Sequence, residues 1–253
     1  ILWFDFSYKH FFSDGKTAED WDSEGIIEEV KALQPHILIN NRLDLPEEAD
    51  FFTPEQTVPY GPLVDRKGKA ITWEGCHTFS GSWGYHRDEH NWKSETMLIQ
   101  LLVDHVSRNG NLLLNVGPDG RGAFCDRAMQ ALEGVARWMD LHQDAIYGCG
   151  APPTGLEPPS GCRYTYCHDR SKLYIHLYYW PFQQLHLPGL AGRVKDACLQ
   201  HDRSELLYNE IDDAVPWGPE QTPPAGTVTL LLPTIPPPTP IPVIEITLQD
   251  PTP

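Results

Sequence analysis

The first 150 residues alternate short apolar runs with stretches in which apolar residues recur at helical spacing. The apolar runs predict strands at "ILWFDF" (1–6), "HILIN" (36–40), "KAITWEG" (69–75) and "NLLLNVG" (111–117). The helical spacing predicts helices over 18–35, 93–110 and 125–143. Several strand runs are continuously apolar, so both of their faces should be buried, which is typical of a parallel sheet covered by helices. The pattern therefore predicts β/α units.

After residue 150 the pattern changes. The Pro- and Gly-rich segment "APPTGLEPPSG" (151–161) precedes short runs, several of them alternating, and no stretch has convincing helical spacing. These runs predict an antiparallel β-sandwich over 151–253, with strands at "CRYTYCHD", "KLYIHLYY", "QQLHLPG", "KDACLQ", "TVTLLLP" and "PVIEITLQD". The Pro-rich segment 232–242 is expected to be an extended connector between the last strands.

The number of strands limits the architecture of the first part. Four or five parallel strands precede residue 150, whereas a closed (β/α)₈ barrel needs eight strands in about 250 residues. The chain also begins inside an apolar run. We therefore predict an α/β fold in which residues 1–150 form the C-terminal part of a catalytic (β/α) barrel that lacks its first strands. On this prediction the chain is an N-terminally truncated fragment of a longer protein.

The strongly acidic composition of the chain excludes some classes of binding partner. The formal net charge is −16, and no cluster of Lys and Arg interrupts the acidic background. Nucleic acid and anionic membrane surfaces would be repelled, so neither is an expected partner. The longest apolar runs are shorter than the 18 or more residues that a membrane-spanning helix needs.

The six cysteines leave the redox compartment open. None stands in a C-x-x-C pair, so the usual zinc-ribbon spacing is absent, and no metal site is expected. Cys162 and Cys167 are candidates for a disulfide in an oxidising compartment. Free buried thiols are an equally good interpretation of the same two residues.

Charged residues at the ends of the predicted strands are the first candidates for catalysis, because active sites of barrels lie at the C-terminal ends of their strands. Asp5 ends "ILWFD", and Trp3, two residues earlier, lies on the same side of the strand. Arg42 follows "HILIN" and could hold a carboxylate or a sugar hydroxyl. Taken singly, Asp5 is as well explained by a loop cap or a lysine partner, and Arg42 by a surface salt bridge.

Two further acidic residues lie in aromatic loops. Glu55 stands in "FFTPEQTVP", where apolar surroundings would raise the pKa of its carboxyl group, as a general acid requires. Glu74 and Trp83 belong to "TWEGCHTFSGSWGYHRDEHNW" (72–92), whose aromatic faces suit stacking on sugar rings. An ordinary solvated glutamate and simple core packing are the alternatives for these residues.

Six short motifs occur in an order that points to one family. They are "LWFD", "INNR", "TPEQ", "WEGCHTFSGSWGY", "NGNLLLNVGPDGRG" and "AIYG". In this order they resemble the α-L-fucosidases of glycoside hydrolase family 29. The later "KLYIHLYYWP" and "VIEITL" look like the C-terminal β-sandwich of that family, so the resemblance covers nearly the whole chain.

The resemblance implies hydrolysis of α-L-fucosides with retention of configuration, through a covalent fucosyl-enzyme and without a metal or other cofactor. Asp5 matches the nucleophile of the family. Glu55 matches the acid/base, with Glu74 as the reserve candidate, because the family does not hold that residue at one constant position. Retention requires two carboxyl groups about 5–5.5 Å apart.

The resemblance also implies substrate-binding roles. Arg42 matches an arginine beside the reaction centre, Trp3 an aromatic residue of the pocket, and Trp83 an aromatic residue near the C5 methyl group of fucose. The expected partner is a fucosylated oligosaccharide or glycoconjugate, and the expected location is secreted or lysosomal. The oligomeric state stays open.

One departure from the family keeps alternatives open. The sugar-binding histidines and a further acidic residue of the family lie on its early strands, and no residue here matches them. A non-catalytic carbohydrate-binding or structural relic of a fucosidase is therefore a second hypothesis. A different barrel glycosidase is a third, weaker one.

Overall fold

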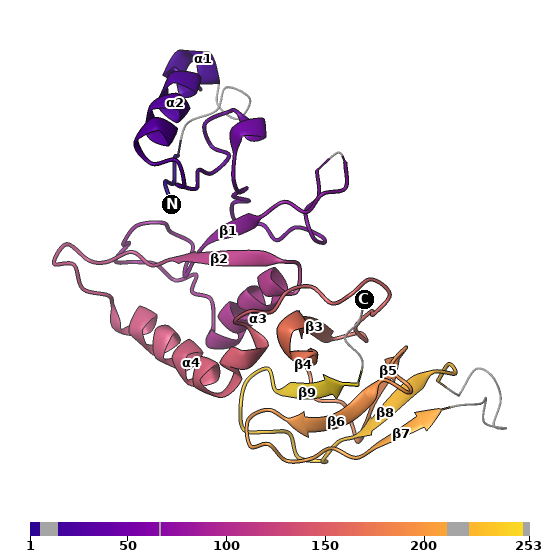
Figure 1. Ribbon diagram of the computed structural model, residues 1–253. Helices are drawn as coiled ribbons and strands as arrows, with labels where there is room; N and C mark the ends of the chain where they lie inside the picture. The colour runs from indigo at the N-terminus through magenta and orange to yellow at the C-terminus, as the bar shows by residue number, and fades with distance from the viewer. Residues whose placement is uncertain (6–14, 66, 212–222, 250–253) are drawn as a thin grey trace. The chain divides into compact units, whose positions relative to one another are not determined.

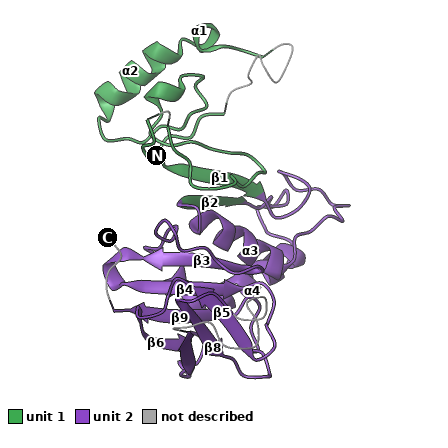
Figure 2. Cartoon of the chain, turned by 90° about the vertical axis from the view of Figure 1, so that its right-hand side faces the viewer, with its two compact units in different colours: residues 1–77, 110–114 green, residues 78–109, 115–253 purple. Residues whose placement is uncertain are grey.

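The structure is a computed structural model that describes residues 1–5, 15–65, 67–211 and 223–249 (Figure 1). The chain divides into two compact units, which Figure 2 colours separately. Unit 1 contains residues 1–77 and 110–114, and unit 2 contains residues 78–109 and 115–253. The domain boundary predicted at residue 150 separates the expected β/α part from the expected β-sandwich, whereas the two units are groups of residues in contact. That boundary stays a prediction. Within the described ranges, every helix is too short or too polar to cross a bilayer.

The predicted helix over 18–35 is two helices in unit 1. Helix α1 (Ala18–Trp21) begins at Thr17, whose hydroxyl and backbone exchange hydrogen bonds with Asp20 in a capping box. Asp22 then adopts a left-handed conformation with φ of 51°, which ends α1 and precedes α2 (Ser23–Leu33). A one-turn 3₁₀ helix, η1 (Pro46–Glu48), follows.

Unit 1 also contains a series of parallel backbone pairings. Isolated parallel bridges join Leu2 to Ile39, Asn40 to Phe51, and Phe52 to Trp73. Strand β1 (Trp73–Thr78) is hydrogen-bonded to β2 (Gly110–Asn115). The predicted strand at 1–6 is thus reduced to one bridge at Leu2, and that at 36–40 to two bridges, at Ile39 and Asn40. Phe6 lies outside the described residues. The strand predicted at 69–75 starts later, at Trp73.

The core of unit 1 is apolar and tightly packed around Trp73. Ile39, Leu43, Phe51 and Trp73 are all buried. A Cβ atom on Gly110 would lie 2.2 Å from the Trp73 ring, so the close approach of the two segments requires glycine there. This packing fixes β1 against β2.

Unit 2 combines helices with two antiparallel sheets (Figure 1). The helices are α3 (Glu95–Val106), capped by the Ser94 hydroxyl, and α4 (Asp126–His142), which continues into the 3₁₀ turn η2 (Gln143–Ala145). The four-stranded sheet has the order β3 (Cys162–Cys167), β4 (Lys172–Leu177), β9 (Val243–Leu248), β6 (Val194–Leu199). The three-stranded sheet has the order β5 (Gln184–Pro188), β8 (Thr227–Leu231), β7 (Tyr208–Ile211). A 3₁₀ turn, η3 (His168–Arg170), joins β3 to β4.

The two sheets share one hydrophobic core, so they form the predicted sandwich. Leu173 and Ile246 of the four-stranded sheet belong to the same buried cluster as Leu187 and Val228 of the three-stranded sheet. Every sandwich strand that the sequence predicted is present, and 232–242 contains neither helix nor strand. The short, polar edge strand β7 was not predicted.

A second buried layer lies between the helices of unit 2 and the four-stranded sheet. Ile99 of α3 and Trp138 of α4 pack with Tyr174 of β4 and Val243 of β9. The Trp138 indole N–H donates a hydrogen bond of 3.1 Å to the carbonyl oxygen of Ile241. The helices are therefore part of the same compact unit as the sandwich.

The pairing of Cys162 with Cys167 is wrong. The two residues are the first and last residues of strand β3, and a strand rises about 3.3 Å per residue. Their Cα atoms are therefore far beyond the separation of about 7 Å that a disulfide can span. Both side chains are buried.

Candidate active site

The candidate site in unit 1 is built on successive parallel segments. Asp5 follows the bridge at Leu2, Arg42 follows the bridges at Ile39 and Asn40, and Glu55 is itself bridged in parallel to Cys76 of β1. Parallel segments end on the same side of a sheet, so side chains at these positions converge although the chain between them is long. The structure brings Asp5, Arg42 and Glu55 together.

Arg42 lies at the centre of this cluster. Its Nη1 is 2.8 Å from Asp5 Oδ1 and 2.7 Å from Glu55 Oε2. Because both oxygens contact the same nitrogen, they can be at most roughly 5.5 Å apart. This upper bound is compatible with the separation of about 5–5.5 Å between the two carboxyl groups of retaining glycosidases.

The remaining nitrogens of Arg42 are fixed by residues that the sequence analysis missed. Nε donates to the Thr53 hydroxyl at 2.9 Å, and Nη2 donates to the Thr53 carbonyl at 3.2 Å. The Asn41 side-chain oxygen accepts from both the backbone N–H and the hydroxyl of Thr53, at 2.9 and 3.0 Å. The signal was present in "INNR", whose first asparagine, Asn40, also binds the backbone N–H and C=O of Phe4.

Trp3 and Glu74 complete the cluster in unit 1. The Arg42 guanidinium carbon lies 4.5 Å from the centre of the Trp3 ring, a cation–π contact. The Trp3 indole N–H donates to Glu74 Oε1 at 3.1 Å. Glu74 therefore contacts the cluster through Trp3, whereas Glu55 is bound directly to the arginine.

The site exposes its carboxylates and buries its cation. The side chain of Arg42 is 10% exposed, against 69% for Asp5 and 44% for Glu55. Burial lowers the pKa of Arg42, but the hydrogen bonds to Glu55 and Asp5 outweigh burial, so its pKa is raised overall. The apolar surroundings predicted for Glu55 are not found, because its carboxylate is partly exposed and paired with Arg42.

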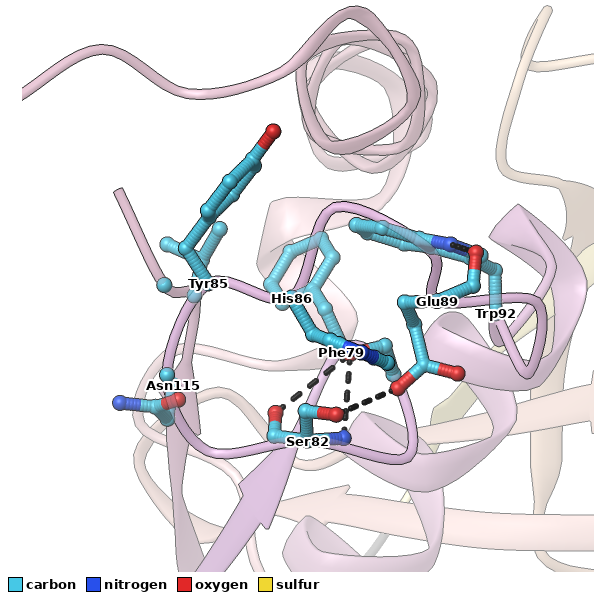
Figure 3. A pocket seen from close by; sticks show the side chains of 11 residues that line it. Phe79, Ser82, Tyr85, His86, Glu89, Trp92 and Asn115 are labelled. Atoms are coloured by element: carbon cyan, nitrogen blue, oxygen red, sulfur yellow. Dashed lines mark hydrogen bonds between the residues drawn. The ribbon is translucent and has the colours of Figure 1, made fainter. Parts of the chain in front are cut away.

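Trp83 belongs to unit 2 and is 42% exposed. The loop around it forms a small pocket, which Figure 3 shows, but Trp83 itself is not among the lining residues. Glu89 organises this loop by accepting hydrogen bonds from the Ser82 hydroxyl at 2.6 Å and from the Asn91 N–H at 2.7 Å. These bonds lower the pKa of Glu89. The lining side chains labelled in Figure 3 are Phe79, Ser82, Tyr85, His86, Glu89, Trp92 and Asn115.

The chemistry available in unit 1 is that of two carboxylates held by one guanidinium. One carboxylate can attack a carbon electrophile while the other transfers a proton to or from the leaving oxygen. Among the described residues, no group of three or more His, Cys, Asp or Glu side chains is arranged to hold a metal ion.

Comparison with known proteins agrees with the sequence motifs. The family model described as "Alpha-L-fucosidase" matches residues 1–144. The structure of α-L-fucosidase isoenzyme 1 from Paenibacillus thiaminolyticus is 37% identical, with a TM-score of 0.84, over 98% of this chain and 57% of that chain. The tissue α-L-fucosidase of Bos taurus is 32% identical over 112 residues, which are 43% of this chain and 23% of that protein.

A more distant structure shares the fold. It is an α-L-fucosidase of glycoside hydrolase family 29 from Bacteroides thetaiotaomicron, described as a trapped covalent intermediate, with 22% identity and a TM-score of 0.72 over 91% of this chain and 53% of that chain. The chain thus spans little more than half the length of these structures and a smaller part of the curated relatives. With more than half of its residues matched by the family model, the chain belongs to the α-L-fucosidase family.

Proposed function

We propose that this chain supplies the nucleophile and the acid/base of a retaining α-L-fucosidase whose substrate is a fucosylated oligosaccharide or glycoconjugate. The observation that carries the proposal is the binding of Asp5 and Glu55 to the same nitrogen of Arg42. That arrangement keeps the two oxygens within roughly 5.5 Å of each other, which is compatible with the spacing that double displacement needs. The successive parallel pairings of unit 1 support a further proposal, that this unit is part of a (β/α) barrel.

The first proposed step forms a covalent bond to Asp5. A carboxylate oxygen of Asp5 attacks the anomeric carbon of fucose while Glu55 gives its proton to the departing glycosidic oxygen. A protonated carboxyl group cannot keep an ion pair, so substrate binding should separate Glu55 from Arg42. The 2.8 Å contact between Arg42 and Asp5 would persist and orient the nucleophile.

The second step releases fucose. Glu55, now a carboxylate, removes a proton from a water molecule, whose oxygen attacks the same anomeric carbon and frees Asp5. Two inversions give overall retention. A trapped covalent intermediate is named for the Bacteroides thetaiotaomicron fucosidase that shares the fold, which supports this order of events.

The choice of Glu55 over Glu74 rests on contact with the arginine. Glu55 shares Nη1 of Arg42 with the nucleophile, whereas Glu74 is bound to the Trp3 indole. Glu74 is the reserve candidate, and on the present proposal it positions Trp3. Trp3 would pack against the sugar. The role of Trp83 near the C5 methyl group stays a prediction from the family resemblance, because Trp83 belongs to unit 2.

The nucleophile can be tested in the polypeptide that contains these 253 residues. Asp5→Gly should lower hydrolysis of an aryl α-L-fucoside by roughly 10⁴-fold or more. Azide should restore turnover and yield the β-fucosyl azide, because azide would then occupy the place of the missing carboxylate. A fluorinated fucosyl reagent should label Asp5 in the unmodified protein. Normal turnover in the variant, or a label on another residue, would overturn the proposal.

The acid/base can be tested by changing the leaving group. Glu55→Ala should lose far less activity on an aryl fucoside with a good leaving group than on an oligosaccharide, because a good leaving group needs little protonation. Glu74→Ala is the matched control and should lose similar activity on both substrates. Azide rescue of Glu55→Ala should yield the α-fucosyl azide. If Glu74→Ala shows this pattern instead, the assignment passes to Glu74.

A further inference from the structure

Two cysteines of unit 2 face each other across an antiparallel pairing that is separate from the candidate active site. Gly150 and Tyr166 form an isolated antiparallel bridge and exchange both backbone hydrogen bonds, each 2.9 Å long. The next residue pair outward is Cys149 and Cys167. Continuing this register by one residue brings these two cysteines opposite each other.

This position in the register is the one where side chains come closest. Residues that exchange both hydrogen bonds alternate with non-hydrogen-bonded pairs, whose Cα atoms are about 4.5 Å apart and whose side chains lie nearest to each other. Gly150 and Tyr166 are a hydrogen-bonded pair, so Cys149 and Cys167 are a non-hydrogen-bonded pair. Such a separation lies within the range that a disulfide spans.

The side chains agree with the register. Cys167 belongs to the buried layer between the helices and the sheet, and Cys149 packs against the same layer. Burial raises the pKa of the Cys149 thiol to about 12, and the contact with the Cys167 sulfur adds to this shift. The two thiol groups are therefore in contact.

Neighbouring polar groups hold the two sulfur atoms in place. Cys149 Sγ donates to the Asp144 carbonyl at 3.2 Å, and Arg170 Nε donates to Cys167 Sγ at 2.9 Å. Arg170 Nη2 also donates to the carbonyls of Asp144 and Tyr147, at 3.2 and 2.9 Å. The hydrogen bond to Cys167 is the main cause of the raised pKa of Arg170.

We propose that Cys149 and Cys167 form a disulfide bond in an oxidising compartment and fasten the chain after helix α4 to the first strand of the sandwich. The bond would close a loop of roughly 20 residues that contains the Pro- and Gly-rich segment 151–161. It replaces the pairing of Cys162 with Cys167, which the strand geometry excludes.

The oxidant is a small-molecule or protein disulfide, R–S–S–R. Cys149, the more exposed of the two, loses its proton to solvent, attacks one sulfur of the oxidant and displaces R–S⁻. The Cys167 thiolate, held next to Arg170, then attacks the Cys149 sulfur and displaces the second R–S⁻. The two protein thiols lose two electrons and two protons, and the oxidant becomes two R–SH. The high pKa of Cys149 makes the first step slow in the folded protein.

The test is a map of disulfide bonds in the folded chain after equilibration with mixtures of oxidised and reduced glutathione. At oxidising ratios, alkylation followed by non-reducing peptide mass mapping should find the peptide of Cys149 joined to that of Cys167. The number of reactive thiols in denaturant should fall from six to four. The unmodified chain gives this result directly, so it does not depend on a variant that folds.

Two variants make the assignment specific. Cys167→Ser should abolish the cross-linked peptide and leave Cys149 alkylated or bound to glutathione. Cys125→Ser, a matched change at the half-buried N-cap of α4, should leave the cross-link intact. Recovery of Cys149 and Cys167 as separate alkylated peptides from the oxidised chain would overturn the proposal. So would a cross-link from either of them to another cysteine.

Discussion

The two units each hold one buried charge between two opposite charges, with the signs reversed. In unit 1 the buried cation Arg42 contacts the carboxylates of Asp5 and Glu55. In unit 2 the buried anion Glu245 contacts the cations Lys172 and Arg203, at 2.6 and 2.7 Å. Each triad neutralises its central charge, as a buried charge requires.

The difference lies in the backbone that carries each triad. Glu245 stands in β9, between Tyr174 of β4 and Cys198 of β6, so its surroundings are continuous sheet on both sides. Arg42 and its partners stand on segments joined by isolated bridges, and the carboxylate of Asp5 is largely exposed while that of Glu55 is partly exposed. We infer that the triad in unit 2 serves stability, whereas the triad in unit 1 presents two reactive groups to a ligand.

The largest expected effect comes from removing the cation of unit 1. Arg42→Met should lower kcat/KM on an aryl α-L-fucoside by roughly 10³-fold, because it takes away the charge that orients Asp5. Arg42→Lys should recover only part of the loss, because an ammonium group cannot bind Asp5, Glu55 and Thr53 together. Equal activity of Arg42→Met and the unmodified protein would contradict the inferred role of Arg42 and its two carboxylates.

The next effect concerns two buried histidines of unit 2. The Nδ1–H of His142 on α4 donates a 3.1 Å hydrogen bond to Gln200 Oε1, and His142 is near His201. His176 on β4 is hydrogen-bonded to the Thr165 hydroxyl at 2.9 Å. Burial lowers the pKa of His142 to about 4 and that of His176 to about 3. Both groups stay neutral in the folded state at neutral pH.

The sign of the resulting pH dependence follows from the lowered pKa values. An unfolded histidine titrates near 6.5, so the unfolded chain binds more protons as the pH falls below that value. The stability that depends on these two groups is therefore complete above about pH 6.5. It is lost as the pH falls toward about 4 for His142 and about 3 for His176, by on the order of 3 kcal/mol for each histidine. Urea denaturation at pH 7 and pH 5 measures the loss. His142→Gln should reduce the loss of unfolding free energy between pH 7 and pH 5, and the exposed control His36→Gln should leave this loss unchanged.

A smaller effect is expected from the anion of unit 2. Glu245→Gln should lower the free energy of unfolding by about 2 kcal/mol, because Lys172 and Arg203 lose their counter-ion but retain some contact with water. Its kcat/KM on an aryl α-L-fucoside should stay within about twofold of the value for the unmodified protein, since the inferred role of Glu245 is structural. Glu157→Gln, an exposed control, should change neither quantity. A large loss of activity in folded Glu245→Gln would contradict the inference that this triad serves stability alone.

The carboxylate of Glu245 should make the stability of the fold depend on pH in a second, more acidic range. Burial would raise the pKa of Glu245, but hydrogen bonds from Arg203 and Lys172 outweigh burial, so its pKa is lowered overall. A carboxylate with a lowered pKa stabilises the fold above the unfolded value of about 4.3 and loses that contribution as the pH falls further. The Glu245→Gln variant should therefore show a shallower decline in stability below pH 4 than the unmodified chain.

Much of unit 2 could be predicted from sequence because its signals are local. Helical spacing located α3 and α4, and alternating runs between turn residues located the strands of the sandwich except β7. The exception, "YNEI", is four residues long and half polar, since it is an edge strand with little to bury. The break at Asp22 was missed because a left-handed residue within a helical pattern leaves no periodic signal.

The contacts that give the sites their chemistry could not be predicted in the same way. Strand ends identified Asp5 and Arg42 as candidates, but the sharing of one nitrogen with Glu55 depends on how three segments pair. Likewise, the sequence offered Cys162 and Cys167 as disulfide candidates, with free thiols as an equal alternative, whereas the bridge between Gly150 and Tyr166 brings Cys149 next to Cys167. Register is set by long-range pairing, and local periodicity does not encode it.

The bridge between Gly150 and Tyr166 also has a consequence for the segment that it encloses. The Ala151 N–H donates a hydrogen bond of 2.6 Å to the Asn109 side-chain oxygen. Together with the bridge, this bond holds both ends of the enclosed segment in place. Leu156 anchors its middle in the sandwich core, while Thr154 and Gly155 are exposed. Doubling the length of such a loop costs only about 0.6 kcal/mol. The turn at Thr154 and Gly155 is therefore a natural place to graft a tag or a small domain onto this protein without disturbing either triad.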